Sequence, residues 1–243
     1  MANWSDPRPT AAPFGATRTG VGSTEYDAGL RAYMLRVYNY MASGVLLTGI
    51  VALTFALSGY AQAIFYQPGF LKYVIMFAPL AIVFGMSFGQ NRMSTATLQA
   101  LFWGFAVLMG LSLSTIFFQY NPISIAAAFA STSAGFLALS LYGYTTKRDL
   151  SAFATFLLIG LVGLIVASIL AIWFPALNPI ISIVGVLLFA GLTAYDTQRT
   201  KELYAQVAGS DMEGKVVIMS ALSLYLDFIN MFMFILRLFG SRD

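Results

Sequence analysis

Seven long runs of hydrophobic residues follow one another along the chain, separated by shorter polar segments. The runs cover residues 37–57, 71–88, 96–118, 122–144, 152–174, 179–195 and 216–239. Each is close to the roughly 20 residues that a helix needs to cross a bilayer. Because backbone polar groups must be satisfied internally in lipid, each run is predicted to be a helix. The pattern therefore predicts an all-α membrane protein with seven transmembrane helices.

The seventh run differs from the others because it carries Asp227 near its midpoint and Asn230 about one turn later. These two belong to a set spaced at three and four residues, which places the set on one face of a helix. The set is Ser220, Ser223, Asp227, Asn230, Phe234 and Arg237. A carboxylate at this depth costs about 2.5–3.5 kcal/mol on insertion scales and normally faces protein or water. We expect Asp227 to be the working group of a helix inside a bundle. The alternatives are a structural acid bonded within the bundle, or a re-entrant seventh run that would leave six spans.

Composition narrows the classes of protein and site. The chain is 59% hydrophobic and 9% charged, whereas soluble domains carry about 25% charged residues. It has no Cys and no His, which excludes disulfides, thiol nucleophiles, His-based metal sites and Ser-His-Asp triads. The net charge of +3 is small and suits loops beside an anionic leaflet better than nucleic-acid binding.

The positive charges predict the topology. Residues 1–30 are polar and proline-containing and are predicted to form a disordered cytoplasmic tail before a transmembrane domain at 31–243. Lys and Arg favour the cytoplasmic side of a membrane. With the N-terminus inside, the cytoplasmic segments hold Arg8, Arg18, Arg31, Arg36, Arg92, Lys147, Arg148, Arg199, Lys201 and Lys215, and the outer segments hold Lys72, Arg237 and Arg242. The bias therefore places the N-terminus in the cytoplasm and, after seven crossings, the C-terminus outside.

A second acid, Asp196, lies near the cytoplasmic end of the sixth run. At about 1.5 Å of rise per residue, Asp227 lies roughly 10–16 Å deeper, a gap that helix tilt could close. Two carboxylates in contact cannot both ionise cheaply, so they would titrate as a unit and sense pH without histidine. The alternative for Asp196 is a surface ion pair with Arg199, three residues on. Arg92, at the start of the third run, either pairs with one of the acids or serves as a topology signal.

Several segments resemble the transmembrane Bax inhibitor motif family in its bacterial branch. The most specific is ALSLYLDFIN at 221–230. The supporting segments are QALFW at 99–103, GLSLS at 110–114, TKRDLS at 146–151, AYDTQ at 194–198 and LRLFG at 236–240. The resemblance covers about residues 31–240. It implies seven helices, with the seventh buried centrally among two groups of three.

The resemblance further implies a calcium-permeable leak channel of the bacterial inner membrane, governed by pH through two aspartates on the sixth and seventh helices. Asp196 and Asp227 match these positions, and Arg92 matches the gating arginine of the family. Calcium takes about 6–8 oxygen ligands at 2.3–2.6 Å. The two carboxylates, with Asn230 and backbone or water oxygens, are therefore expected to form a weak, transient calcium site, because a conducted ion must also leave. Ser223 and Asn230 are expected to line the ion pathway, and no resident cofactor is expected.

Two other functions fit parts of the pattern. Paired membrane aspartates also serve intramembrane aspartyl proteases, but those enzymes place the second acid in a Gly-x-Gly-Asp turn. This chain has Leu224, Tyr225 and Leu226 before Asp227, so we expect no enzyme activity. Bacterial members of the family are also associated with modulation of a membrane-anchored ATP-dependent protease. A role as a membrane regulator that uses the tail and the loop at 201–215 is therefore the alternative to the channel.

Overall fold

Helices account for the regular structure of this chain. The computed structural model describes residues 19–241, with side chains described from residue 25 onward. In this part of the chain there are eight α-helices, three short 3-10 helices and no strand. The α-helices are α1 (Thr19–Leu57), α2 (Tyr60–Tyr66), α3 (Leu71–Gly89), α4 (Thr95–Leu113), α5 (Pro122–Thr145), α6 (Ala154–Leu170), α7 (Asn178–Val207) and α8 (Glu213–Phe239). The 3-10 helices are η1 (Ser114–Phe118), η2 (Ser151–Phe153) and η3 (Pro175–Leu177).

The seven predicted spans are confirmed. Within the described residues, seven helical segments are long and apolar enough to cross a membrane, and they match the seven hydrophobic runs one for one. Local capping sets some of the ends. The Ser94 side chain accepts a hydrogen bond from the Thr97 amide at the start of α4. At the start of α5, the Asn121 side chain accepts a hydrogen bond from the Ile123 amide. Pro122 is the first residue of this helix, a position where the missing amide hydrogen of proline costs no helical hydrogen bond.

Two helices extend past the predicted spans. The first helix begins at Thr19, so residues 19–30, which the sequence assigns to a disordered tail, are helical. The first 18 residues of that predicted tail, including Arg8 and Arg18, lie outside the described residues, as does Arg242. The sixth span was predicted to end at residue 195, but α7 continues to Val207. Hydropathy marks the lipid-embedded part of a helix, and it gives no signal for turns that continue into water.

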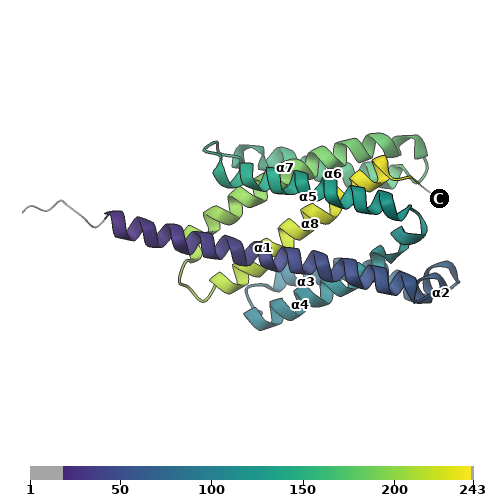
Figure 1. Ribbon diagram of the computed structural model, residues 1–243, viewed down its shortest axis with the longest axis horizontal. Coiled ribbons are helices and arrows are strands. Elements are labelled where there is room, and N and C mark those ends of the chain that lie inside the picture. Colours follow the sequence, from purple (N-terminus) through teal and green to yellow (C-terminus); the bar gives the residue numbers. More distant parts are fainter. Residues whose placement is uncertain (1–18, 242–243) are drawn as a thin grey trace, which may run out of the picture.

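The last helix is the most buried of the seven spans. In α8, 67% of the apolar stretch is buried, against at most 33% in any other span. It packs against α1, α4, α5 and α7, and Figure 1 shows it running diagonally through the bundle. The arrangement of the other six spans as two groups of three around it stays a prediction.

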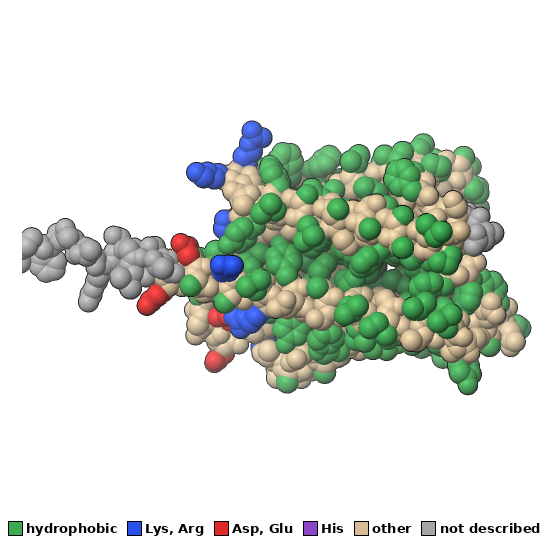
Figure 2. All heavy atoms as spheres, in the orientation of Figure 1, with side chains coloured by type: hydrophobic (Ala, Val, Ile, Leu, Met, Phe, Trp, Pro, Cys, Tyr) green, Lys and Arg blue, Asp and Glu red, His purple; other side chains and the backbone are tan. Residues whose placement is uncertain are grey.

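The outer surface suits a lipid environment. On the face shown in Figure 2, hydrophobic side chains cover the length of the bundle, and Lys and Arg side chains gather at the end where α1 emerges. We call this end the charged end of the bundle. The span that contains α6 is the least buried, at 11% of its apolar stretch. Which side of the membrane the charged end faces stays a prediction from the charge bias.

Candidate functional site

Asp196 and Asp227 lie on the two helices with the most extensive mutual packing, α7 and α8. The two helices are consecutive and antiparallel, so the C-terminal half of α7 faces the N-terminal half of α8. Small buried residues, such as Thr193 on α7 and Ala221 on α8, are fully excluded from solvent. Close packing of this kind relies on small residues, because lipid gives no hydrophobic drive for helix association.

Asp227 is buried without a partner for one of its oxygens. Its side chain is 4% exposed, and Oδ2 makes no hydrogen bond to any described residue. The carboxylate of Asp196 lies near enough to interact with it electrostatically. A buried charge without compensation is costly. The structure therefore brings the two predicted acids close enough to influence one another, and it leaves one oxygen of the deeper acid without a hydrogen-bond partner among the described residues.

A hollow of about 250 Å³ opens between α7 and α8 on the side of Asp196. We call it the acidic hollow. Six of its nine lining residues are polar or charged, namely Gln90, Asp196, Arg199, Thr200, Ser220 and Ser223. Ser223 is exposed to this space, and Asp227 follows it on α8 by four residues, a rise of about 6 Å. The hollow thus reaches the turn of α8 that precedes Asp227.

The other members of the predicted polar face lie deeper along α8. Asn230 is half-buried, and its Nδ2 donates to the backbone oxygen of Leu226 at 2.8 Å. This bond anchors the amide nitrogen to its own helix and leaves the side-chain oxygen as the group that can meet an ion. Phe234 is buried, and Arg237 is exposed near the end of the helix.

Of the two arginines that the sequence offered as partners for the acids, Arg199 lies beside Asp196. Arg92 lies exposed in the turn between α3 and α4, and within the described residues no hydrogen bond or ion pair joins its side chain to either acid. Its neighbour Gln90 does line the acidic hollow. Arg199 lies in the same hollow, and its charge acts on Asp196. The i+3 spacing of Asp196 and Arg199 was the available signal for this proximity.

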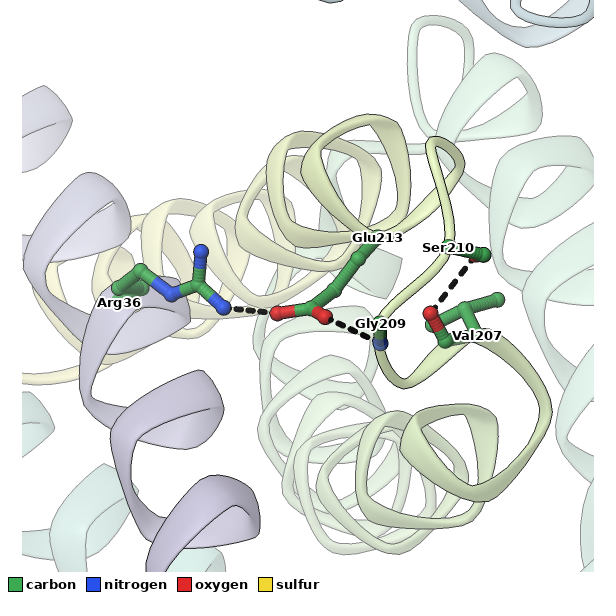
Figure 3. Close-up of polar contacts among 5 residues, drawn as sticks. All are labelled: Arg36, Val207, Gly209, Ser210 and Glu213. Carbon is green, nitrogen blue, oxygen red and sulfur yellow. Dashed lines mark hydrogen bonds and ion pairs between the residues drawn. The ribbon is translucent and has the colours of Figure 1, made fainter.

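A second polar contact ties the turn between α7 and α8 to α1 (Figure 3). Glu213, the first residue of α8, forms an ion pair with Arg36 of α1. Its other oxygen accepts a hydrogen bond from the amide of Gly209 at 3.0 Å. Gly209 has φ +71°, a left-handed conformation that glycine adopts at little cost. Sequence reasoning missed this contact, because Arg36 and Glu213 are 177 residues apart.

Two of the motifs that carry the family resemblance meet at the charged end. The Gln198 side chain accepts a hydrogen bond from the Leu150 amide and donates one to the Arg148 carbonyl, each at 2.8 Å. Within the first motif, the Ser151 hydroxyl and amide both donate to Asp149, and these bonds hold the pKa of that exposed carboxyl below its usual range. The segments that carry the family resemblance therefore include hydrogen bonds that join α7 to the segment before α6.

Among the described residues no cluster of three or more Asp, Glu, His or Cys side chains is placed to hold a metal ion. Asp196 and Asp227 supply two carboxylates, and any further ligands would have to be amide, hydroxyl, backbone or water oxygens. Calcium affinity falls as the number of charged ligands falls. Two carboxylates would therefore bind calcium weakly, as conduction requires and storage does not. The weak calcium site stays a prediction.

Comparison with known proteins gives the family. The family model described as "Inhibitor of apoptosis-promoting Bax1" matches residues 30–243. The chain is 45% identical over 220 residues to "Uncharacterized protein RP147" of Rickettsia prowazekii (strain Madrid E), covering 89% of this chain and 92% of that protein. It is 42% identical over 219 residues to "Inner membrane protein YbhL" of Escherichia coli (strain K12), covering 88% and 94%.

A relative from Deinococcus radiodurans is 41% identical over 217 residues, covering 88% of this chain and 92% of that protein. The matched region starts just before the first predicted span and includes both acids and all seven spans. The chain belongs to the Bax inhibitor family of membrane proteins and has bacterial relatives along nearly its whole length.

Proposed function

We propose that this protein is a pH-dependent, calcium-permeable leak channel gated by Asp196 and Asp227. The observation that carries the proposal is the unpartnered, buried oxygen of Asp227 beside the charge of Asp196. Ionisable residues inside a membrane domain are rare and usually mark ion or proton pathways. The acidic hollow gives Asp196 contact with solvent at the charged end, so ions could enter from that side.

The chemistry of the pair accounts for both calcium and pH. Carboxylate oxygens are hard ligands that suit calcium, and protons bind to the same oxygens. Calcium and protons therefore compete for one pair of acids. The charged group that faces Asp196 from its own helix is Arg199, and the one that faces Asp227 is Asp196. A proton, a calcium ion or the guanidinium of Arg199 can each offset the repulsion between the two carboxylates.

The membrane and the orientation are part of the proposal. The relative in Escherichia coli is named as an inner membrane protein, and the charge bias places the charged end in the cytoplasm. The acidic hollow would then open to the cytoplasm and the C-terminus would lie outside. Regulation of a membrane-anchored protease stays a prediction from the family resemblance.

Calcium flux into liposomes tests the proposal. Purified protein reconstituted with a calcium-sensitive dye inside should pass calcium at a rate that differs between neutral and acidic buffer. Asp227→Asn keeps the size of the side chain and removes its charge, so it should abolish that difference. Asp211→Asn, which makes the same change in the exposed turn before α8, should behave as wild type. Traces from Asp227→Asn and wild type that respond equally to pH would sink the channel proposal.

A further inference from the structure

A second hollow lies at the other end of the α7–α8 contact. It measures about 610 Å³ and is lined by Asn178 and Ser182 from the start of α7 and by Arg237 from the end of α8. We call it the outer hollow. Because α7 and α8 are antiparallel, the acidic hollow and the outer hollow lie at opposite ends of the same contact between the two helices. An ion that crosses the bundle along this contact must pass through the residues that separate the two hollows.

An apolar layer made by two aromatic rings lies between them. Phe234 is 8% exposed and Phe189 is 6% exposed. Their rings stack with centroids 6.0 Å apart and an angle of 27° between the planes. Phe234 belongs to the same face of α8 as Asp227, Asn230 and Arg237, so it continues the polar face with an apolar side chain.

The Phe234 ring packs directly against the backbone of α7 at Gly185. A Cβ added to Gly185 would lie 2.6–2.7 Å from three carbons of that ring, closer than carbon atoms can pack. The absence of a side chain at Gly185 therefore lets the ring fill the space between the two helices. The guanidinium carbon of Arg237 lies 5.7 Å from the centroid of the same ring.

The spacing places this layer between the acids and the outer hollow. At about 1.5 Å of rise per residue, Phe234 lies about 10 Å beyond Asp227 and about 5 Å before Arg237. On α7, Phe189 lies about 10 Å from Asp196 and about 10 Å from Ser182 by the same measure. An ion that leaves the acids toward the outer hollow along this contact must pass the two rings.

We propose that Phe189 and Phe234, seated on Gly185, form the apolar barrier that closes the ion pathway between the acid pair and the outer hollow. This inference deepens the proposed function and rests on it. Narrow apolar constrictions block ions because water leaves them and a bare ion does not enter. The acids then set whether an ion binds, and the aromatic pair sets whether it crosses.

The first test measures calcium flux through a barrier variant and a matched control. Phe234→Ala removes the ring, so the flux of reconstituted protein should rise several-fold in both neutral and acidic buffer. Phe232→Ala is the control, because Phe232 is also buried on α8 but belongs to a separate apolar cluster with Ile116 and Leu236. It removes the same number of atoms and should leave the flux near the wild-type rate. Thermal unfolding of both variants in detergent confirms that each is folded.

The second test does not depend on calcium conduction. The natural chain has no cysteine, so Ser182→Cys introduces a single thiol in the outer hollow. Silver ions added only on the side of the acidic hollow should fail to modify this thiol in otherwise wild-type protein. They should modify it when Phe234→Ala is also present, and Phe232→Ala should leave it protected. Sided vesicles carrying Ser223→Cys identify the side to which the acidic hollow opens.

The outcomes separate the barrier from the channel. If wild-type protein passes no calcium but Phe234→Ala opens the Ser182→Cys thiol to silver, the barrier stands and the proposed function fails. If wild-type flux depends on Asp227 but Phe234→Ala matches Phe232→Ala in both flux and silver access, the barrier is overturned and the channel stands. Equal silver access in all variants also overturns it.

Discussion

Two helices of the bundle, α6 and α8, are both long enough to cross a membrane but have opposite surroundings. The span that contains α6 is the most apolar of the seven and the least buried, at 11% of its apolar stretch. Helix α8 carries an acid and an amide near its middle and is 67% buried. In water, the more apolar helix would be the inner one. In a membrane, lipid solvates apolar side chains, and helices are held inside by close packing and polar contacts.

The contrast between a packed and a lipid-facing helix surface predicts that glycines in these two environments respond in opposite ways to the same substitution. A Cβ at Gly143 of α5 would clash with the backbone oxygen of Ala194 on α7, whereas nothing lies within 4 Å of a Cβ at Gly163 of α6. Gly143→Ala should lower the free energy of unfolding by about 1–3 kcal/mol, because backbone atoms must shift. Gly163→Ala should raise it by up to about 1 kcal/mol through helix propensity.

Unfolding of the two glycine variants in mixed detergent micelles, followed by circular dichroism, measures the difference. Equal stability of Gly143→Ala and Gly163→Ala would show that the α5–α7 contact does not constrain the fold.

Loss of a polar contact should lower the free energy of unfolding less than a packing clash does. The loss should be larger inside the bundle than at its surface. The hydroxyls of Thr48 on α1 and Tyr225 on α8 lie 2.7 Å apart, and both residues are buried. Tyr225→Phe should cost roughly 0.6 kcal/mol, the average for hydrogen bonds between membrane helices. Tyr142→Phe, at a side chain that is 48% exposed, serves as the matched control and should cost less. A larger loss from Tyr142→Phe would reverse the ranking.

The smallest effect is expected at the rim, where water screens charges. Arg36 is 52% exposed on its side chain, so its ion pair with Glu213 is weakly stabilising. Glu213→Gln removes the charge and keeps an oxygen that can accept from the Gly209 amide. It should lower the free energy of unfolding by roughly 0.2–0.5 kcal/mol, less than Tyr225→Phe does. High salt should reduce this difference further, and a loss above that of Gly143→Ala would contradict the expected order.

The sequence predicted the spans well because hydropathy is a local property of each helix. It also singled out Asp227, since a carboxylate within an apolar run is conspicuous without any knowledge of the fold. Asp196 was singled out by its place at the end of the sixth run and by the family resemblance. The start of α1 at Thr19 was missed because the Gly- and Thr-rich segment before residue 30 has weak helix propensity.

Contacts between distant residues were the main part that the sequence did not predict. Arg92 and Arg199 were both offered as partners of the acids, and the sequence left open which of them lies beside Asp196. The ion pair of Arg36 with Glu213 and the seat of Phe234 on Gly185 depend on how the helices pack. Such contacts require coordinates, because helix periodicity gives the face of a residue and leaves its neighbour undetermined.

The most direct test of the central claim is a double-mutant cycle on the two acids, read as the pH dependence of calcium flux. Asp196→Asn, Asp227→Asn and the double variant are compared with wild type in liposomes. If the carboxylates act as one titrating unit, each single variant should lose the pH dependence, and the double variant should differ little from either. Independent effects that add in the double variant, or pH dependence that survives all three, would contradict the account.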